Sequence, residues 1–158
     1  MSQRLSSSER FVAALVVSSI EEDQGTLRTI FAAPEWSWEA VPTIAKARSR
    51  LARGGVPSVV ICECHLSDGD WKHLFRETER LSQPPKFIVS SRLADEDLWV
   101  EVLSAGAYDV LPTPFDPHEV SRVVRGAAES WHRESEEVKS CRHMTNIGRS
   151  AFQTRSAF

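Results

Sequence analysis

The sequence has few cysteines and no long uninterrupted hydrophobic run. Its three cysteines, Cys62, Cys64 and Cys141, form an odd and sparse set, which argues against a disulfide framework. No apolar stretch approaches the roughly 20 residues that a membrane-spanning helix needs. A broad basic region is also missing, because 22 Asp and Glu residues outnumber 19 Lys and Arg residues. Nothing in the composition therefore indicates a membrane or a nucleic acid as partner.

The N-terminal part of the chain superficially resembles a signal peptide, since arginines precede the apolar run of residues 11–17. The run is at the short limit for such a peptide, and it leads into Glu21, Glu22 and Asp23 without a small-residue cleavage site. We therefore expect a protein of the cytoplasm.

Short apolar runs alternate with amphipathic stretches five times along the chain. The runs predict strands at residues 11–17, 36–41, 58–64, 87–90 and 108–111. The amphipathic stretches predict helices at residues 21–33, 42–53, 71–81, 94–105 and from residue 116 onward. This alternation predicts an α/β fold in which helices cover both faces of a parallel sheet. In such folds the functional crevice lies at the carboxyl ends of the strands.

The chain divides into one domain and two flanking segments. Residues 1–10 are polar and are predicted to be a disordered N-terminus. Residues 11–133 are predicted to form the domain. Residues 134–158 carry no periodic apolar face and are predicted to form a flexible C-terminal tail.

Two kinds of ligand site can be weighed against simpler interpretations. Cys62 and Cys64 flank Glu63, and a C-x-C pair on a strand places both sulfurs on one face. We expect them to be buried hydrophobic side chains, because their spacing fits no closed zinc site. Ser18 and Ser19 begin like a phosphate-binding or flavin-binding loop, but three acidic residues follow and would repel a phosphate.

The other acidic residues have ordinary structural explanations. Glu21, Glu22 and Asp23 stand in the first turn of a predicted helix, where they interact favourably with the helix dipole. Asp68 is expected in a loop turn and Asp70 at a helix N-cap.

Two segments resemble motifs of one known family. Residues 59–70, VVICECHLSDGD, are similar to the segment that ends the third strand of the receiver domain of response regulators. Residues 104–115, SAGAYDVLPTPF, are similar to the receiver stretch Ala-Gly-Ala-x-x-Tyr-Leu-x-Lys-Pro-Phe. The resemblance covers about residues 11–132. It implies a flavodoxin-like, five-stranded parallel sheet of strand order 2-1-3-4-5 and a place in two-component signalling.

The resemblance also implies a phosphoacceptor pocket, in which only one residue keeps its chemical kind. The family's acidic pair falls on Ser18 and Ser19, its phosphate-accepting Asp on Glu63, its hydroxyl on Ser91, its Lys on Thr113, and its switch aromatic on Val110. The family's Lys-Pro bond is usually cis, so the resemblance predicts a cis peptide between Thr113 and Pro114.

These departures predict that the phosphoacceptor chemistry is lost. Mg²⁺ requires hard oxygen ligands, and Glu63 is the one carboxylate left among the carried-over positions. Thr113 stands where the resemblance implies the lysine that stabilises phosphoryl transfer. We therefore expect no cofactor, no Mg²⁺ site and no enzymatic activity. Two interpretations of Glu63 stay open: a fixed charge that mimics the phosphorylated state, and a solvated carboxylate at a strand end.

The leading functional interpretation is a stand-alone, degenerate receiver of a phosphorelay that acts independently of phosphorylation. It would work by binding a protein partner, which can be a kinase, another regulator or an effector. One alternative is a working phosphotransfer receiver with an altered acceptor site. Another is an assembly subunit without any switch function.

The predicted interaction surface is centred on Trp99 with Val110, on the face that the fourth helix, fifth strand and fifth helix form in receivers. Trp99 is expected to point toward solvent, where it would be a candidate for a binding hot spot or for a homodimer contact. The alternative is that Trp99 lies flat over its own helix. Trp36 and Trp38 are expected to cover a sheet edge rather than to bind a ligand.

Overall fold

The computed structural model of the chain describes residues 12–153, with side chains described as far as Met144. Residues 1–10, predicted to be disordered, lie outside the described part. The strands are β1 (Val12–Val17), β2 (Trp36–Val41), β3 (Val59–Glu63), β4 (His65–Leu66), β5 (Gly69–Asp70), β6 (Lys86–Ser91) and β7 (Asp109–Pro112). The helices are α1 (Glu21–Ile30), α2 (Ile44–Ala52), α3 (Trp71–Glu79), α4 (Glu96–Ala105) and α5 (Pro117–Gln153).

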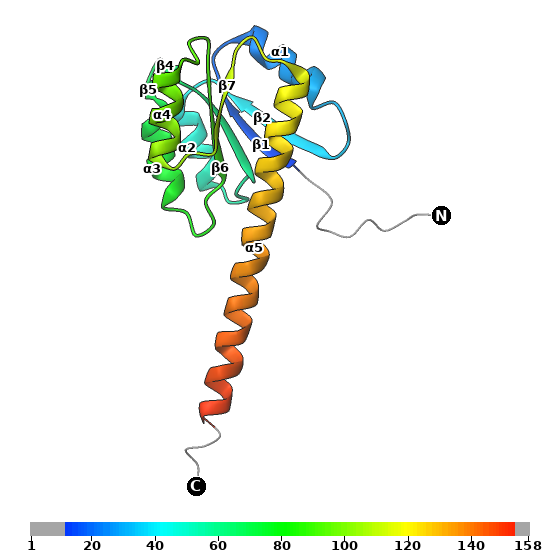
Figure 1. Cartoon of the computed structure of the whole chain (residues 1–158), viewed down its shortest axis with the longest axis vertical. Helices are drawn as coiled ribbons and strands as arrows, with labels where there is room; N and C mark the ends of the chain where they lie inside the picture. Colours follow the sequence, from blue (N-terminus) through cyan, green and yellow to red (C-terminus); the bar gives the residue numbers. More distant parts are fainter. Residues whose placement is uncertain (1–11, 154–158) are drawn as a thin grey trace, which may run out of the picture.

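Five of the strands form one parallel sheet in the order β2-β1-β3-β6-β7 (Figure 1). Leaving out the short hairpin β4–β5, this order along the chain is 2-1-3-4-5, so the predicted flavodoxin-like sheet is confirmed. In the register, Val17 lies beside both Val41 and Cys62, and Ser90 lies beside Leu111. The central strands therefore end at one common edge.

Helices cover both faces of the sheet, which explains why the strands are apolar on both sides. The first face packs against α2, α3 and α4, and Trp71 is its largest fully buried side chain. The second face packs against α1 and α5, where Leu27 and Val124 are fully buried.

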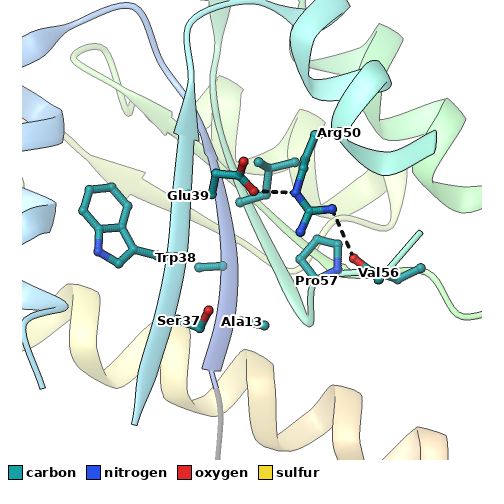
Figure 2. Close-up of a pocket in the computed structure, with 10 residues that line it drawn as sticks. Ala13, Ser37, Trp38, Glu39, Arg50, Val56 and Pro57 are labelled. Carbon is teal, nitrogen blue, oxygen red and sulfur yellow. Dashed lines mark hydrogen bonds and ion pairs between the residues drawn. The ribbon is translucent and has the colours of Figure 1, made fainter. Parts of the chain in front are cut away.

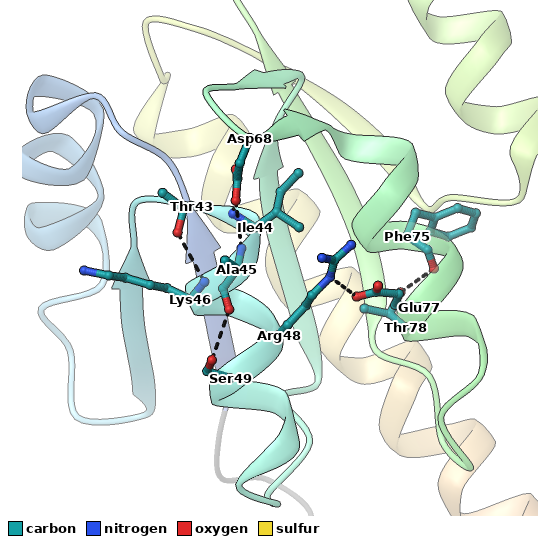
Figure 3. Close-up of polar contacts among 10 residues, drawn as sticks. All are labelled: Thr43, Ile44, Ala45, Lys46, Arg48, Ser49, Asp68, Phe75, Glu77 and Thr78. Atoms are coloured by element: carbon teal, nitrogen blue, oxygen red, sulfur yellow. Dashed lines mark hydrogen bonds and ion pairs between the residues drawn. The ribbon is translucent and has the colours of Figure 1, made fainter.

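The short antiparallel hairpin β4–β5 takes the place of a predicted loop (Figure 3). The carboxylate of Asp68, in the hairpin turn, accepts hydrogen bonds from the backbone amides of Ile44 at 3.1 Å and Ala45 at 2.9 Å. Asp68 therefore caps the N-terminus of α2 from a distant segment. Asp70 is the N-cap of α3, as predicted, and its side chain accepts from the Lys72 amide at 3.0 Å.

Helix α5 is a single helix of 37 residues that projects well beyond the sheet (Figure 1). Residues 134–153, for which the sequence predicts a flexible tail, are helical. The prediction relied on a missing apolar face, whereas the helix continues beyond the part of α5 that packs in the core. The Lys86 ammonium, on β6, also donates to the Glu134 carboxylate at 2.7 Å.

The outer strand β2 carries two tryptophans that pack inside the domain. Trp36 stacks on Phe31 with ring centroids 4.6 Å apart, and Trp38 meets Phe31 edge-on at 5.7 Å. The Arg125 guanidinium of α5 lies 5.3 Å from the centre of the Trp36 ring. These contacts agree with the prediction that the pair covers a sheet edge.

Across the described residues, every helix is either too short or too polar to cross a bilayer.

Candidate functional site

The carboxyl ends of the central strands border a pocket of about 220 Å³, here called the strand-end pocket. Parallel α/β sheets place their ligand sites at this edge. Its lining residues come from the last residues of β3 and β6, from the start of β4, from the first turn of α1 and from the loops after β1, β3, β6 and β7: Ile20, Asp23, Glu63, Cys64, His65, Ser90, Ser91, Arg92, Leu93 and Thr113.

Glu63, at the end of β3, is held by two of the residues predicted to contact it. The buried Ser18 hydroxyl donates to Glu63 Oε2 at 3.4 Å, and the Ser19 backbone amide donates to the same oxygen at 3.3 Å. The Ser18 oxygen also accepts from the Ile20 amide at 3.2 Å, which fixes the turn into α1. The loop after β1 thus offers hydrogen-bond donors to Glu63.

Ser91 and Thr113 border the same pocket but play different local roles. Ser91 Oγ accepts a hydrogen bond from the Leu93 amide at 3.1 Å, so it stabilises the loop before α4 instead of contacting Glu63. Thr113 is buried, and the peptide bond between Thr113 and Pro114 is cis, which confirms that prediction.

The sequence interpretation was incomplete for Asp23. Glu21 and Glu22 are exposed in the first turn of α1, as expected for residues that interact with the helix dipole, but Asp23 is only 6% exposed and borders the strand-end pocket. Burial raises the pKa of the Asp23 carboxyl, the positive charge of Arg92 opposes this shift, and the charge of Glu63 adds to it. The pocket therefore holds a second carboxylate that the resemblance does not identify.

A signal for this placement exists in the sequence. Asp23 precedes Leu27 by four residues, so the two share one face of α1, and Leu27 is fully buried. Arg92 was not identified either, because a single arginine after a strand carries no pattern.

The two cysteines near the pocket are buried, as predicted. Cys62 is 0% exposed and Cys64 is 8% exposed. Burial raises the pKa of both thiols, and the negative charge of Glu63 raises the pKa of Cys62 further. Both thiols are therefore protonated at neutral pH, which suits a packing role.

The predicted interaction surface needs correction. Val110 is fully buried in the core against α2, α3 and α4, and Trp99 is partly buried against the same core, so neither side chain points to solvent. The error came from the inward positions of α4. Leu98 and Val102 are buried, Leu103 is 49% exposed, and Trp99 packs on the core beside Leu98 and Val102.

A second hollow, of about 390 Å³, lies beside β1 and β2 and is bordered by Gly55, Val56 and Pro57 before β3 (Figure 2). Arg50 of α2 projects into it and is already engaged. Its Nε donates to Glu39, and its Nη1 donates to the carbonyl oxygens of Gly54 at 3.2 Å and Gly55 at 3.5 Å. This arrangement joins α2 to the sheet edge and leaves little free chemistry for a ligand.

The strand-end pocket offers two carboxylates as candidate ligands for a magnesium ion. Mg²⁺ needs several oxygen ligands in octahedral geometry. Among the described lining residues, carboxylates come from Asp23 and Glu63, while Ile20 and Leu93 add apolar walls that cannot coordinate. No group of three or more potential ligand side chains occurs in the part of the chain that the structure describes.

Neither a family model nor a curated protein matches this sequence. Solved structures do match its fold. A signal receiver domain of an HD domain-containing protein from Pseudomonas fluorescens Pf-5 has a TM-score of 0.73 at 24% identity, covering 85% of this chain and 98% of that chain. The chain has the receiver fold.

Other solved structures match at lower identity. A response regulator receiver domain protein from Clostridium thermocellum has a TM-score of 0.67 at 13% identity, covering 75% of this chain and 95% of that chain. An adenylate cyclase structure from Rhodopirellula baltica has a TM-score of 0.75 at 10% identity, covering 83% of this chain and 97% of that chain. The receiver fold therefore spans most of this chain, and the strand-end pocket lies where the resemblance places the phosphoacceptor.

Proposed function

We propose that this protein is a receiver-like signalling module that works without phosphorylation and without Mg²⁺, by binding a protein partner. The environment of Glu63 carries this proposal. The two positions after β1 supply a hydroxyl and a backbone amide to the Glu63 carboxylate, in place of acidic metal ligands. Thr113 supplies no positive charge at the position where the resemblance implies a lysine.

Phosphoryl transfer to a carboxylate depends on positive charge that neutralises the phosphoryl oxygens. Arg92 borders the pocket, but its charge is opposed by both Asp23 and Glu63. An incoming phosphoryl group would meet two carboxylates and, at Thr113, no positive charge, which raises the barrier to transfer. We therefore propose a non-enzymatic protein of the cytoplasm.

Acetyl phosphate with MgCl₂, followed by intact-mass measurement, tests the proposal. We expect no phosphoryl adduct on the wild-type chain. A variant that combines Ser18→Asp, Ser19→Asp, Glu63→Asp and Thr113→Lys, with its fold checked by circular dichroism, is the matched positive control. An adduct on the wild-type chain that maps to Glu63 would show instead a working receiver with an altered acceptor.

We propose that the partner binds exposed apolar side chains on and before α4. Leu93 is 79% exposed, Val100 is 60% exposed, and Leu103 is 49% exposed; we call these three residues the α4 apolar surface. Val100 and Leu103 are three residues apart on α4 and so lie on one side of the helix, and large exposed apolar side chains often mark interaction sites. A kinase, another regulator, an effector or a second copy of the chain can use this surface.

Serine substitutions on this surface test its role. The double variant Val100→Ser, Leu103→Ser keeps the buried side of α4 intact, because Leu98, Trp99 and Val102 are unchanged. Sedimentation equilibrium compares the self-association of the two proteins, and affinity measurements compare their binding to any purified partner. Unchanged association and unchanged partner binding in the variant would move the interface elsewhere.

A further inference from the structure

Asp23 is a buried carboxylate without a direct partner. It is 94% buried and borders the strand-end pocket, and within the described residues it makes no hydrogen bond or ion pair. Glu63 supplies a second carboxylate to the same pocket. A largely buried carboxylate that faces a pocket and makes no direct ion pair has room for an opposite charge from outside the chain.

The charge of the pocket favours a cation as that group. Asp23 and Glu63 contribute two negative charges, and Arg92 contributes one positive charge. Glu21 and Glu22 lie on the same first turn of α1 and add negative potential outside the pocket. The Arg92 guanidinium makes no ion pair with either lining carboxylate within the described residues, so it weakens the negative field without removing it.

The walls of the pocket favour a cation that carries an apolar stem. Ile20 and Leu93 line it together with the buried Cys64. A strongly hydrated inorganic ion gains nothing from such walls, whereas the methylene groups of a lysine or arginine side chain pack well against them. Leu93 also belongs to the α4 apolar surface, so a partner on that surface lies directly beside the pocket.

We propose that the strand-end pocket binds a cationic side chain, a lysine or an arginine, of the protein partner, with Asp23 and Glu63 as its counter-charges. This inference rests on the proposed function and identifies the chemistry that its partner presents. The pocket that the resemblance identifies with the phosphoacceptor site then binds a positively charged side chain of another protein. Leu93 packs against the methylene groups of that side chain.

Small probes of each chemistry test this proposal on the full chain. The ¹⁵N-labelled protein is titrated with n-butylammonium chloride, which represents a lysine side chain, and separately with n-propylguanidinium chloride, which represents arginine. Sodium chloride keeps the ionic strength constant, and n-butanol is the uncharged comparison. We expect saturable shifts of the Ser19, Asp23 and Leu93 amide signals with at least one of the two cations and not with n-butanol.

Matched variants assign the binding to the pocket. Asp23→Asn is expected to weaken the binding of the cation at least tenfold, which corresponds to about 1.4 kcal/mol. Glu21→Gln removes an exposed carboxylate from the same helical turn and is expected to change the binding less than twofold. Arg92→Gln is expected to strengthen the binding several-fold, because it removes the competing positive charge.

Several results would contradict the proposal that the strand-end pocket binds a cationic side chain. They are equal shifts with n-butanol, unchanged binding in Asp23→Asn, and displacement of the organic cation by submillimolar MgCl₂. Binding that appears only in Arg92→Gln would show that Arg92 itself is the resident cation. None of these results restores phosphorylation, so acetyl phosphate treatment still decides the proposed function separately.

Discussion

Replacement of Trp99 by alanine distinguishes a core residue from a binding hot spot. Trp99 lies on α4 between the buried residues Leu98 and Val102 and packs on the core that α2, α3 and α4 share with the sheet. The same helix is tied to α3 by an ion pair between Lys72 and Glu101. Removal of the indole therefore leaves a gap under a helix that other contacts hold in place, so the gap cannot close fully.

The size of the effect follows from the buried area. A tryptophan buries about 150–250 Å² when it is fully enclosed. Trp99 is partly buried, and we take about two thirds of this area as buried in the folded protein. At about 25 cal/mol per Å², the loss of this burial lowers the free energy of unfolding by about 3 kcal/mol. For a domain of this size, we expect Trp99→Ala to lower the melting temperature by roughly 6–12 °C.

Urea unfolding followed by circular dichroism at 222 nm measures this loss without relying on tryptophan fluorescence. The double variant Val100→Ser, Leu103→Ser is the matched control, and its free energy of unfolding is expected to change by less than about 0.5 kcal/mol, as at ordinary surface positions. The reasoning is refuted if Trp99→Ala loses less than about 1 kcal/mol of stability and yet abolishes self-association or partner binding.

Three further variants test the buried and charged positions. Val110→Ala should lower the free energy of unfolding by about 1.5–3 kcal/mol in the same urea experiment, because Val110 is fully buried; a loss below 0.5 kcal/mol would return it to the surface. Hydrogen bonds from the Ala45 and Ile44 amides lower the pKa of Asp68 in the folded protein. Asp68 therefore stabilises the fold above pH 4 or so, and this contribution is lost as pH falls through the lowered pKa. Wild type should be more stable than Asp68→Asn at pH 7, with a difference that narrows toward pH 2–3, and a constant difference would contradict the assignment. Asp23 has the opposite sign, because burial raises the pKa of its carboxyl. Asp23→Asn should be more stable than wild type at pH 7 in chemical denaturation, and the two should converge as pH falls below about 4; a destabilised variant at pH 7 would show that the charge is paired.

The fold could be predicted from the sequence because its signals are local and repeated. The buried apolar run predicts strand β3, and the glycine after α4 predicts where that helix ends. Neither prediction depends on residues far away in the sequence. Gly106, for example, has φ of 96°, a left-handed conformation that ends α4 and suits glycine. The strand order then followed from the motifs at residues 59–70 and 104–115.

The site could be predicted only where the resemblance supplies positions. It brought Ser18, Ser19, Glu63, Ser91 and Thr113 to one pocket region, and the structure places all five at the strand ends. It could not say that Ser91 would use its hydroxyl on the Leu93 amide, because that choice depends on the path of the loop.

Residues outside the motifs were harder to place. The inward turn of Asp23 depends on how α1 is rotated against the sheet, which a run of three acidic residues does not reveal. Trp99 could have been placed from the sequence, because at about 100° per residue it lies between Val102 and Leu103 around α4 and close to the buried side of the helix.

The length of α5 has a mechanical consequence. At about 1.5 Å per residue, its 37 residues span about 55 Å, and the first part is anchored in the domain core through Val120, Val124 and Ala127. A rigid rod held at one end enlarges small movements at the other, so a tilt of a few degrees at the sheet displaces the far end of the helix by several ångströms. Each residue also turns the helix by about 100°, so insertion of a single residue after Glu134 would rotate everything beyond it to a different side of the molecule.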